Sequence, residues 1–404
     1  MSDPRLLGES ELRDRVERLS ALDRGSATHG EREASDLIEA ELRGLGLDVR
    51  RDVEVVHGGY WLPVGLAAAG GVLAAAAGRV PGALIGSLAA AAVVDDIDAG
   101  PRVIRRAALA KRHTANLSVE LGPPDSETTV LVVAHYDAAH SGLVFHPELP
   151  RIPLRRFPAV AKKASTTPPT MWGAIAGPAL AALGAALGSR RLRLAGGVLS
   201  AGYAAAMADI ALRKVVPGAN DNATGVAAAL SIAHWLAEEP PSVRVILLFT
   251  GSEESLLEGM QRYGERHFAR LDRERTHVIC VDTVGSPQLL TLEAEGMVKM
   301  RRFPRQFLNL LHECADELGV HVHRGLRFRN STDATVALKA GYPALMIGSV
   351  DEFKIPTDYH WPTDTPDRVN YRTVADAARL VQALIRRLGA QPSAAAGSPA
   401  ASSA

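Results

Sequence analysis

The sequence has few of the residues that mark several classes of protein. Only two cysteines occur among its 404 residues, which excludes a fold built on disulfide bonds. The 45 Lys and Arg residues are matched by 45 Asp and Glu residues, so the chain carries no net charge. A nucleic-acid partner is therefore not expected, because binding to phosphates needs a basic surface. The N-terminal segment MSDPRLLGESELRDRVERLS contains no apolar core and is not a secretory signal peptide.

Apolar residues are abundant, at 47% of the chain, although only 5% of residues are aromatic. They are rich in alanine and are distributed unevenly. Long stretches without any charged residue occur in two pairs, and arginines separate the members of each pair. The uncharged stretches are residues 58–78 and 80–94, separated by Arg79, and residues 164–189 and 194–208, separated by a segment with Arg190, Arg191 and Arg193.

Outside these stretches the chain predicts an alternating α/β fold. Continuous apolar runs rich in β-branched residues occupy residues 128–134, 243–250, 277–281 and 344–347. Runs without alternation suit strands that are buried on both faces. Helical patterns fall between and after the later runs, at residues 225–238, 256–269, 303–318, 333–340 and 373–388. This rhythm predicts a mostly parallel mixed sheet sandwiched by helices, with two apolar helical hairpins inserted into it.

Histidines and acidic residues, the types that bind metal ions, follow the predicted strands. They are His135 and Asp137 after the first run, Glu253 and Glu254 after the second, Asp282 after the third, Asp221 in a Gly-bounded loop, and His360 after the last run. The carboxyl ends of parallel strands share one edge of a sheet, where α/β proteins build their sites. We therefore expect these side chains to meet at that edge.

Two histidines and several carboxylates, with no cysteine, form a nitrogen and oxygen ligand set. Zinc is the expected metal, with manganese or cobalt as alternatives. Because a carboxylate has two oxygens, one Asp could bridge two ions about 3.5–4 Å apart. Asp137, two residues beyond His135, could accept the imidazole N–H and orient the ring. The adjacent Glu253 and Glu254 could divide two tasks, one binding metal and the other moving a proton.

Several segments, taken in order, resemble the two-zinc exopeptidase family, which includes bacterial leucyl-type aminopeptidases, glutamate carboxypeptidases and, more distantly, glutaminyl cyclases. They are H-Y-D, G-A-N-D-N-A-T-G, S-E-E, V-D-T-V-G, T-D at residues 332–333 and Y-H-W-P-T-D-T-P, preceded by R-G-S-A-T-H-G-E-R-E-A. The resemblance covers residues 24–57, 115–145 and 216–388. Ala334 follows Asp333 where the family often has His, which bears on substrate preference.

The resemblance implies a metal-dependent aminopeptidase that hydrolyses N-terminal residues from peptides with the help of two zinc ions. It assigns His135 and Asp282 to one zinc ion, Glu254 and His360 to the other, Asp221 to both as a bridge, Glu253 as the general base, and Asp137 to orienting His135.

Other interpretations stay open. A glutaminyl cyclase-like acyl transfer would use one zinc ion, and the complete set of five ligands argues against it. A receptor or assembly protein of the same fold would be signalled by lost ligands or a lost base, and neither is lost. Taken alone, Asp221 is also a good turn residue and His135 a plausible buried histidine, so the metal-site hypothesis depends on all the motifs together.

The hypothesis divides the chain into six segments. Residues 1–57 hold N-terminal helices and the first strand, residues 58–94 and 164–212 are the inserted hairpins, residues 95–163 and 213–388 hold the metal motifs, and residues 389–404 are a low-complexity tail that we expect to be disordered.

We interpret the two inserts as transmembrane hairpins of a multi-pass membrane protein in contact with lipid. A helix needs about 20 apolar residues to cross the hydrocarbon core of a bilayer. Residues 58–78 and 171–189 reach this length, whereas residues 80–94 and 194–208 are fifteen residues each and fall short. Lys and Arg residues flank the inserts and favour a catalytic domain on the cytoplasmic face. A soluble lid or a dimerisation insert is the alternative, and the oligomeric state is left open.

Overall fold

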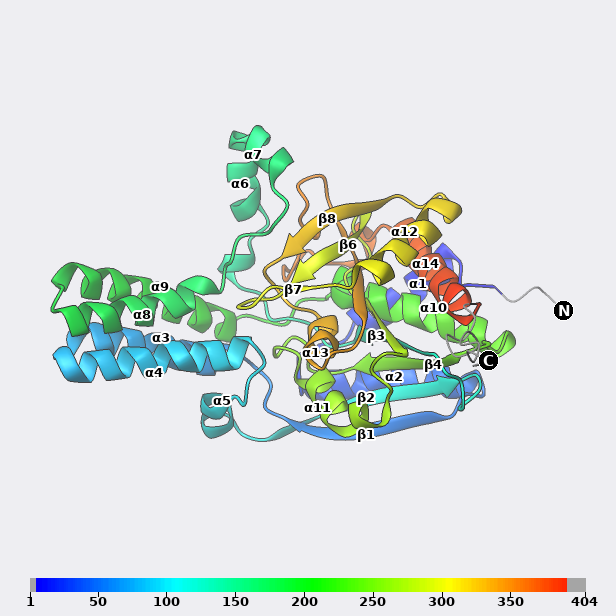
Figure 1. Ribbon diagram of the computed structural model, residues 1–404, viewed down its shortest axis with the longest axis horizontal. Helices are drawn as coiled ribbons and strands as arrows, with labels where there is room; N and C mark the ends of the chain where they lie inside the picture. The colour runs from blue at the N-terminus through cyan, green and yellow to red at the C-terminus, as the bar shows by residue number, and fades with distance from the viewer. Residues whose placement is uncertain (1–4, 391–404) are drawn as a thin grey trace, which may run out of the picture.

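Nine strands form a single sheet within residues 5–390, the part of the chain that the computed structural model describes (Figure 1). The strand order is β1-β2-β4-β3-β5-β9-β6-β7, and β8 pairs with β6. Its centre consists of the four apolar runs expected to be strands, and these pair in parallel: β4 (Arg244–Thr250), β3 (Thr129–His135), β5 (Thr276–Val281) and β9 (Ala344–Val350). Nearly every residue of these strands is buried, which explains why they lack apolar and polar alternation.

Antiparallel strands extend the sheet at both sides. The strands β1 (Val49–Val56) and β2 (Arg112–Leu121) pair antiparallel beside β4. On the other side β6 (Gln288–Glu295) pairs antiparallel with β9 and β7 (Arg301–Arg302) and parallel with β8 (Val322–Phe328). The predicted mixed sheet between helices is therefore confirmed, with its parallel part at the centre.

Helices cover both faces of the sheet (Figure 1). One layer contains α1 (Glu9–Ser20), α2 (His29–Gly44), α10 (Thr224–Glu238), α12 (Arg305–Leu318) and α14 (Tyr371–Gly389). The other layer contains α11 (Glu258–His267) and α13 (Asp333–Lys339). The disordered tail was expected from residue 389, but α14 includes Gly389. The rest of that expected tail, residues 391–404, lies outside the described part of the chain.

The two inserted hairpins join into one four-helix bundle that projects from one end of the α/β domain (Figure 1). Its helices are α3 (Trp61–Ala76), α4 (Arg79–Ile97), α8 (Trp172–Leu187) and α9 (Arg190–Leu212). The expected helix lengths were wrong. The arms expected to be short, α4 and α9, have 19 and 23 residues, whereas α3 and α8 have 16 each. The charged residues taken as boundaries lie inside the ends of α4 and α9.

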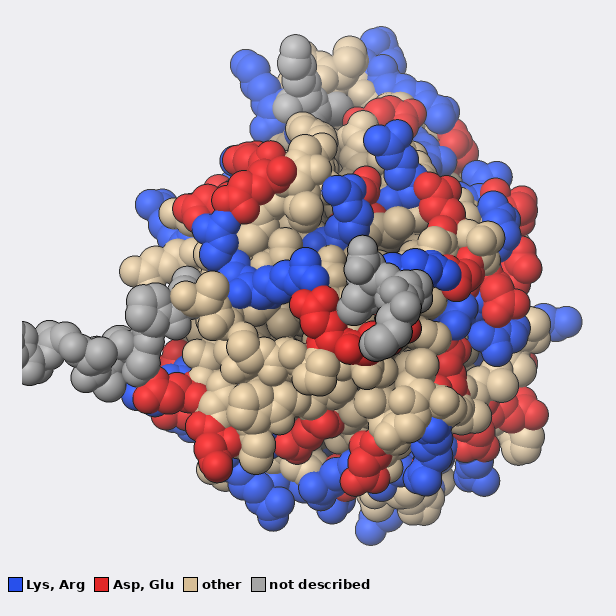
Figure 2. Space-filling view, turned by 90° about the vertical axis from the view of Figure 1, so that its right-hand side faces the viewer, with Lys and Arg blue, Asp and Glu red and all other residues tan. Residues whose placement is uncertain are grey.

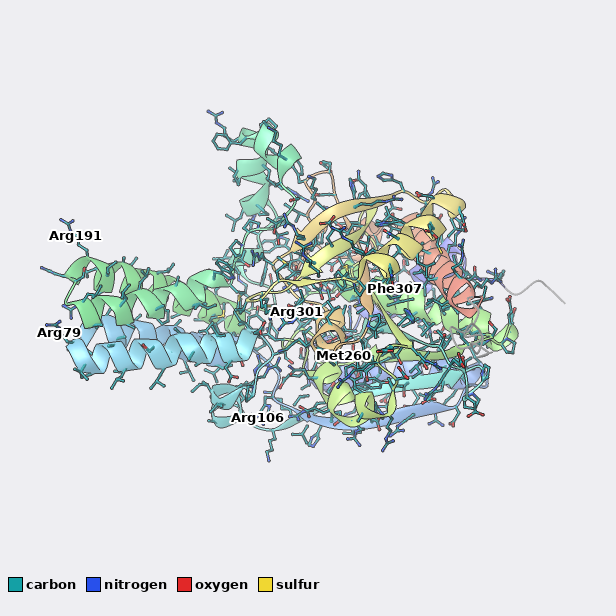
Figure 3. All side chains as sticks on the ribbon, in the orientation of Figure 1. Arg79, Arg106, Arg191, Met260, Arg301 and Phe307 are labelled. Carbon is teal, nitrogen blue, oxygen red and sulfur yellow. The ribbon has the colours of Figure 1, made fainter. Side chains whose placement is uncertain are left out.

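The ends of the bundle differ in their surroundings. Arg79 and Arg191 lie at the tip, far from the sheet (Figure 3). The roots join the α/β domain, where α5 (Val103–Ala108) follows α4 and the short helices α6 (Glu148–Arg156) and α7 (Pro158–Lys163) precede α8. Among the described helices, α4 and α9 are long and apolar enough to cross a membrane, and α3 and α8 are shorter apolar helices.

Small residues form the interior of the bundle. A Cβ atom added at Gly86 of α4 would lie 2.6 Å from the carbonyl oxygen of Pro178, and one added at Gly177 of α8 would lie 2.9 Å from the backbone nitrogen of Ser200. The large apolar side chains point outward instead. Leu84, Leu88 and Val198 are 61%, 71% and 73% exposed. Away from its roots, where Val64 and Val93 are buried, the bundle therefore packs through close backbone contacts and leaves large apolar side chains on the outside.

Candidate metal centre

The seven predicted site residues meet at the carboxyl edge of the parallel strands. His135 ends β3, Asp282 directly follows β5, and the loop after β4 carries Glu253 and Glu254. The remaining positions are Asp137 after β3, Asp221 in the irregular turn Ala219–Ala223 before α10, and His360 in the loop between β9 and α14. All seven side chains are buried or nearly so.

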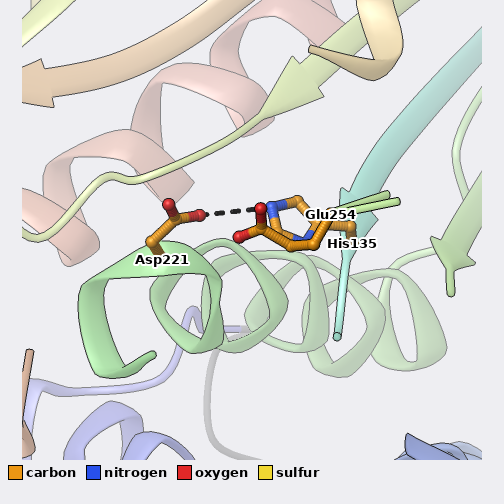
Figure 4. A group of neighbouring side chains, drawn as sticks. All are labelled: His135, Asp221 and Glu254. Atoms are coloured by element: carbon orange, nitrogen blue, oxygen red, sulfur yellow. Dashed lines mark ion pairs between the residues drawn. The ribbon is translucent and has the colours of Figure 1, made fainter. Parts of the chain in front are cut away.

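Asp221 lies between the two histidines, with one carboxylate oxygen toward each. Its Oδ1 is 3.3 Å from Nε2 of His135, and its Oδ2 is 3.3 Å from Nε2 of His360. Figure 4 shows the first of these contacts and the neighbouring Glu254. A carboxylate with one oxygen toward each of two imidazoles has the orientation that a bridging ligand requires.

Each histidine faces a second carboxylate. Nε2 of His360 is 3.1 Å from Oε2 of Glu254, and Nε2 of His135 is 3.9 Å from Oδ1 of Asp282. The side chains thus form two groups that share Asp221. One ligand atom each of His135, Asp221 and Glu254 lie within 4.8 Å of one another, a spacing that could hold a metal ion.

The buried charges shift the pKa values of these groups. Burial would raise the pKa of Asp221, but the two imidazoles hold it below its ordinary value. Burial lowers the pKa of His360, but the carboxylates of Glu254 and Asp221 outweigh this effect and raise the pKa to about 10. Burial is also the main reason that the pKa of Glu253 lies well above its ordinary value. The site therefore gathers several buried carboxylates, whose combined negative charge favours the binding of a cation.

The donor atoms fit a divalent cation. Imidazole nitrogens and carboxylate oxygens are the zinc ligands of sites without cysteine. Oε1 of Glu254 is buried without a hydrogen-bond partner in the described part of the chain. A buried carboxylate oxygen without a partner is costly, and a bound cation would remove this cost.

Asp137 fixes the loop that carries the two glutamates. Its Oδ1 and Oδ2 accept the backbone N–H groups of Glu253 and Glu254, both at 3.0 Å. The side chain of Ser26 donates a further hydrogen bond to it at 2.6 Å. The expected contact with His135 is present at 3.4 Å from Nδ1, but it is not aligned as a hydrogen bond. Asp137 therefore lies where it can position both His135 and the loop.

Two other residues that support the site, Arg24 and Asp364, were not predicted from the sequence. Arg24 is fully buried and donates to the carbonyl oxygens of Tyr136, Pro217 and Gly218. It lies in R-G-S-A-T-H-G, a segment identified only by its resemblance. Asp364 accepts the N–H groups of Asn220 and Asp221 at 2.7 and 3.1 Å, and it belongs to the motif around His360. Both residues fix the loop of Asp221 through backbone contacts, for which the sequence carries no periodic signal.

Aromatic rings surround His360. The ring of Tyr359 stacks on it with centroids 3.8 Å apart, and the ring of Phe145 meets it edge-on at 4.6 Å. Phe145 belongs to a short turn whose first residue, Leu143, donates its backbone N–H to Asp209 near the end of α9. One short turn therefore separates the second hairpin from the candidate metal centre.

Comparison with protein-family models and with solved structures shows what this chain is similar to. Residues 204–385 match the model of peptidase family M28. The predicted resemblance to zinc aminopeptidases is thereby confirmed. No functionally curated protein matches the chain.

Solved structures share the fold at low sequence identity. A Zn-dependent exopeptidase from Parabacteroides distasonis is 13% identical, with a TM-score of 0.57 over 95% of this chain and 99% of that one. A leucine aminopeptidase precursor from Bacteroides thetaiotaomicron is 13% identical, with a TM-score of 0.56 over 96% and 99%. A glutaminyl cyclase from Tannerella forsythia is 15% identical, with a TM-score of 0.57 over 94% and 99%.

Proposed function

We propose that this chain is a two-zinc aminopeptidase held at a membrane by its helical bundle. The observation that carries the catalytic part is Asp221, whose two oxygens face His135 and His360 at 3.3 Å each. His135 and Asp282 would hold one ion, His360 and Glu254 the other, and Asp221 both. The family supports a metal-dependent peptidase, and the two-sided position of Asp221 favours two ions over one.

Zinc bound there would polarise the peptide carbonyl and lower the pKa of a water molecule. Glu253 is the proposed general base, because its carboxyl group belongs to the same buried group without having been assigned as a ligand. Its carboxylate would accept a proton from the attacking water as the new C–O bond forms. It would then deliver this proton to the amine nitrogen as the peptide C–N bond breaks.

A glutaminyl cyclase-like reaction is the second candidate, favoured by the structural similarity to glutaminyl cyclases. In that reaction the α-amine of an N-terminal Gln attacks its own side-chain amide carbonyl and ammonia leaves. Asp221 argues against it here, since a single-ion site needs no carboxylate facing two histidines.

The membrane part of the proposal is supported by the surface of the bundle. Its outward residues are large and apolar, among them Leu66, Leu73, Val80, Leu84, Leu88, Leu187, Leu194 and Val198. So many exposed large apolar residues on one bundle are unusual for a soluble monomer, whereas small residues inside and large apolar residues outside suit helices packed in lipid. The end of the α/β domain opposite the bundle carries interspersed acidic and basic side chains, as a water-exposed surface does (Figure 2).

The test is an activity panel on the full chain, purified in detergent and supplied with zinc. Aminoacyl substrates with a free amine should be hydrolysed, matched N-acetylated substrates should not, and chelation should abolish turnover. Release of ammonia from an N-terminal Gln peptide, with no hydrolysis of any aminoacyl substrate, would show that the chain catalyses the cyclase reaction and not the peptidase reaction. A zinc-loaded chain that turns over neither substrate would refute both.

A further inference from the structure

The loop with Glu253 and Glu254 has a strained backbone that needs support from its surroundings. Three residues of this loop have positive φ angles without being glycine: Ser252 at 53°, Leu256 at 68° and Leu257 at 65°. Such conformations persist where neighbouring contacts hold them in place. Asp137 holds the side of the loop that faces the candidate metal centre.

The other side of this loop is held by the segment that leaves the first hairpin. Arg105 donates to the carbonyl oxygen of Ser255, and Arg102 donates to that of Leu256. Both arginines are buried, at 0% and 4% exposure. Hydrogen bonds from buried guanidinium groups are strong because the donor is charged. The loop is therefore fixed one and two residues beyond Glu254.

Arg105 is itself fixed by the last turns of α4. Its Nε and one terminal nitrogen each lie 2.8 Å from a carboxylate oxygen of Asp96, which is 2% exposed. This two-point contact sets the direction of the guanidinium plane as well as its position. Asp96 belongs to the second helix of the first hairpin, so the end of that helix determines where Arg105 meets the loop.

The other end of the first hairpin reaches the same place through Glu258, at the start of α11. Its carboxylate accepts the backbone N–H groups of His57 at 3.1 Å and Gly58 at 2.9 Å, just before α3. It also accepts the hydroxyl of Ser255 at 2.8 Å and lies 3.3 Å from Arg105. Both ends of the first hairpin thus converge on the residues that directly follow Glu253 and Glu254.

We infer that the first hairpin positions the catalytic loop, with Asp96 and Arg105 as positioning residues that act through Ser255 and Glu258. The effect of this positioning on catalysis rests on the function proposed above, whereas the structural connection between the hairpin and the loop does not. The hairpin is then part of the active-site scaffold as well as an anchor. Neutralising Asp96 removes the two-point contact that sets the direction of the guanidinium plane and leaves Glu258 as the carboxylate beside the buried Arg105. We therefore expect the guanidinium to shift and the loop to loosen.

The chain offers a matched control at the same helix end. Asp98, two residues after Asp96, pairs with Arg301 of β7 at 3.3 Å and with Lys339. This pair also ties the end of α4 to the α/β domain, but it does not touch the loop. Asp96→Asn and Asp98→Asn each remove one carboxylate charge and keep the size of the side chain.

The experiment compares amide hydrogen exchange in the full-length, metal-free chain in detergent, for the wild type and both variants. We expect Asp96→Asn to speed exchange of the amides of residues 252–258 at least about tenfold, while Asp98→Asn leaves them unchanged. Equal protection of this loop in all three proteins would overturn the inference, as would equal loosening by both variants. This readout needs neither metal nor turnover, so it can fail or succeed independently of the proposed function.

Kinetics on the zinc-loaded proteins provide the second readout. Asp96→Asn should lower kcat about tenfold or more with KM nearly unchanged, because a misplaced base affects the chemical step more than binding. Should Asp96→Asn not fold, Arg105→Lys keeps the charge but loses the two-point contact, and it should show the same loosening to a smaller degree. Full wild-type protection of the loop and unchanged kcat in a folded Arg105→Lys protein would overturn the inference.

Discussion

The α/β domain and the helical bundle bury opposite kinds of side chain. Large residues such as Leu131 and Phe249 are fully buried in the sheet, and a group of charged side chains is buried at its carboxyl edge. In the bundle, Gly86 and Gly177 lie inside while Leu88 and Val198 lie outside. Water drives large apolar residues inward, but in lipid close packing of small residues holds helices together. This difference is what we expect if, as proposed, the bundle lies in lipid and the α/β domain in water.

The largest expected effect concerns the charged edge of the α/β domain. Glu253→Gln should lower kcat by about 10²–10⁴-fold, the usual cost of a lost general base, while zinc stays bound. Steady-state kinetics together with metal analysis of the same preparation check this. Glu265→Gln, an exposed position on α11, is the control and should change neither quantity. If Glu253→Gln loses metal and activity in parallel, Glu253 is the metal ligand and Glu254 the general base, the reverse of the proposed assignment.

The next prediction separates the two proposed metal sites. His360→Ala should remove one of two bound zinc ions, since His360 contacts only one side of Asp221. Asp221→Asn should weaken both, because its two oxygens face the two histidines. Metal content after dialysis against trace zinc measures this. A wild-type chain that binds one ion, with no second site under added zinc, would contradict the two-ion proposal.

A buried charge at the junction between the two regions should make stability depend on pH. Burial would raise the pKa of Glu258, but the charges of Arg105 and Arg102 hold it below its ordinary value. A lowered folded-state pKa stabilises the fold above the unfolded pKa of about 4.3, and this contribution is lost as pH falls below it. Glu258→Gln should therefore cost about 3–5 kcal/mol at neutral pH and less in acid.

Thermal unfolding of both proteins from pH 7 down to about pH 2, a range that extends well below the unfolded pKa, is the measurement. The gap in Tm between wild type and Glu258→Gln should narrow as the pH falls. A gap that stays constant over this range would show that the carboxylate contributes through packing rather than through its charge.

The smallest expected effect tests the packing of the bundle. A Cβ atom at Gly196 of α9 would lie 2.7 Å from the carbonyl oxygen of Gly177, whereas one at Gly202 of the same helix would meet nothing within 4 Å. Gly196→Ala should destabilise the bundle by about 1–3 kcal/mol through overpacking. Gly202→Ala should be neutral or slightly stabilising, because Ala has the higher helix propensity. Unfolding in detergent compares them, and equal effects would refute the close packing.

Much of the fold could be predicted because the central strands are buried on both faces and read as apolar runs. The proposed metal ligands follow those runs directly, so parallel topology alone brings them to one edge. The strands β2, β6 and β8, which lie outside the central parallel group, were missed, since they lie toward the sides of the sheet and mix polar with apolar residues. Their place depends on pairing partners that are distant in sequence.

The support around the site could not be predicted for a related reason. Arg24 and Asp364 act on backbone groups of the Asp221 loop, far away in the chain. In the sequence, Asp95 and Asp96 directly follow the uncharged stretch 80–94, whereas in the structure Asp96 lies inside α4 and binds Arg105. A charge at the end of an apolar run marks a solvent boundary in sequence, and only the folded chain shows that it has a buried partner.

The proposed function depends most on one chain joining a water-exposed peptidase domain to a lipid-exposed bundle. Alkaline carbonate extraction of membranes from cells that express the full chain tests this directly. The chain should stay in the membrane pellet and enter solution only with detergent, because its outward leucines and valines would otherwise face water. Recovery of the intact chain as a detergent-free monomer or dimer would contradict the claim, and would make the bundle a lid or a dimerisation insert.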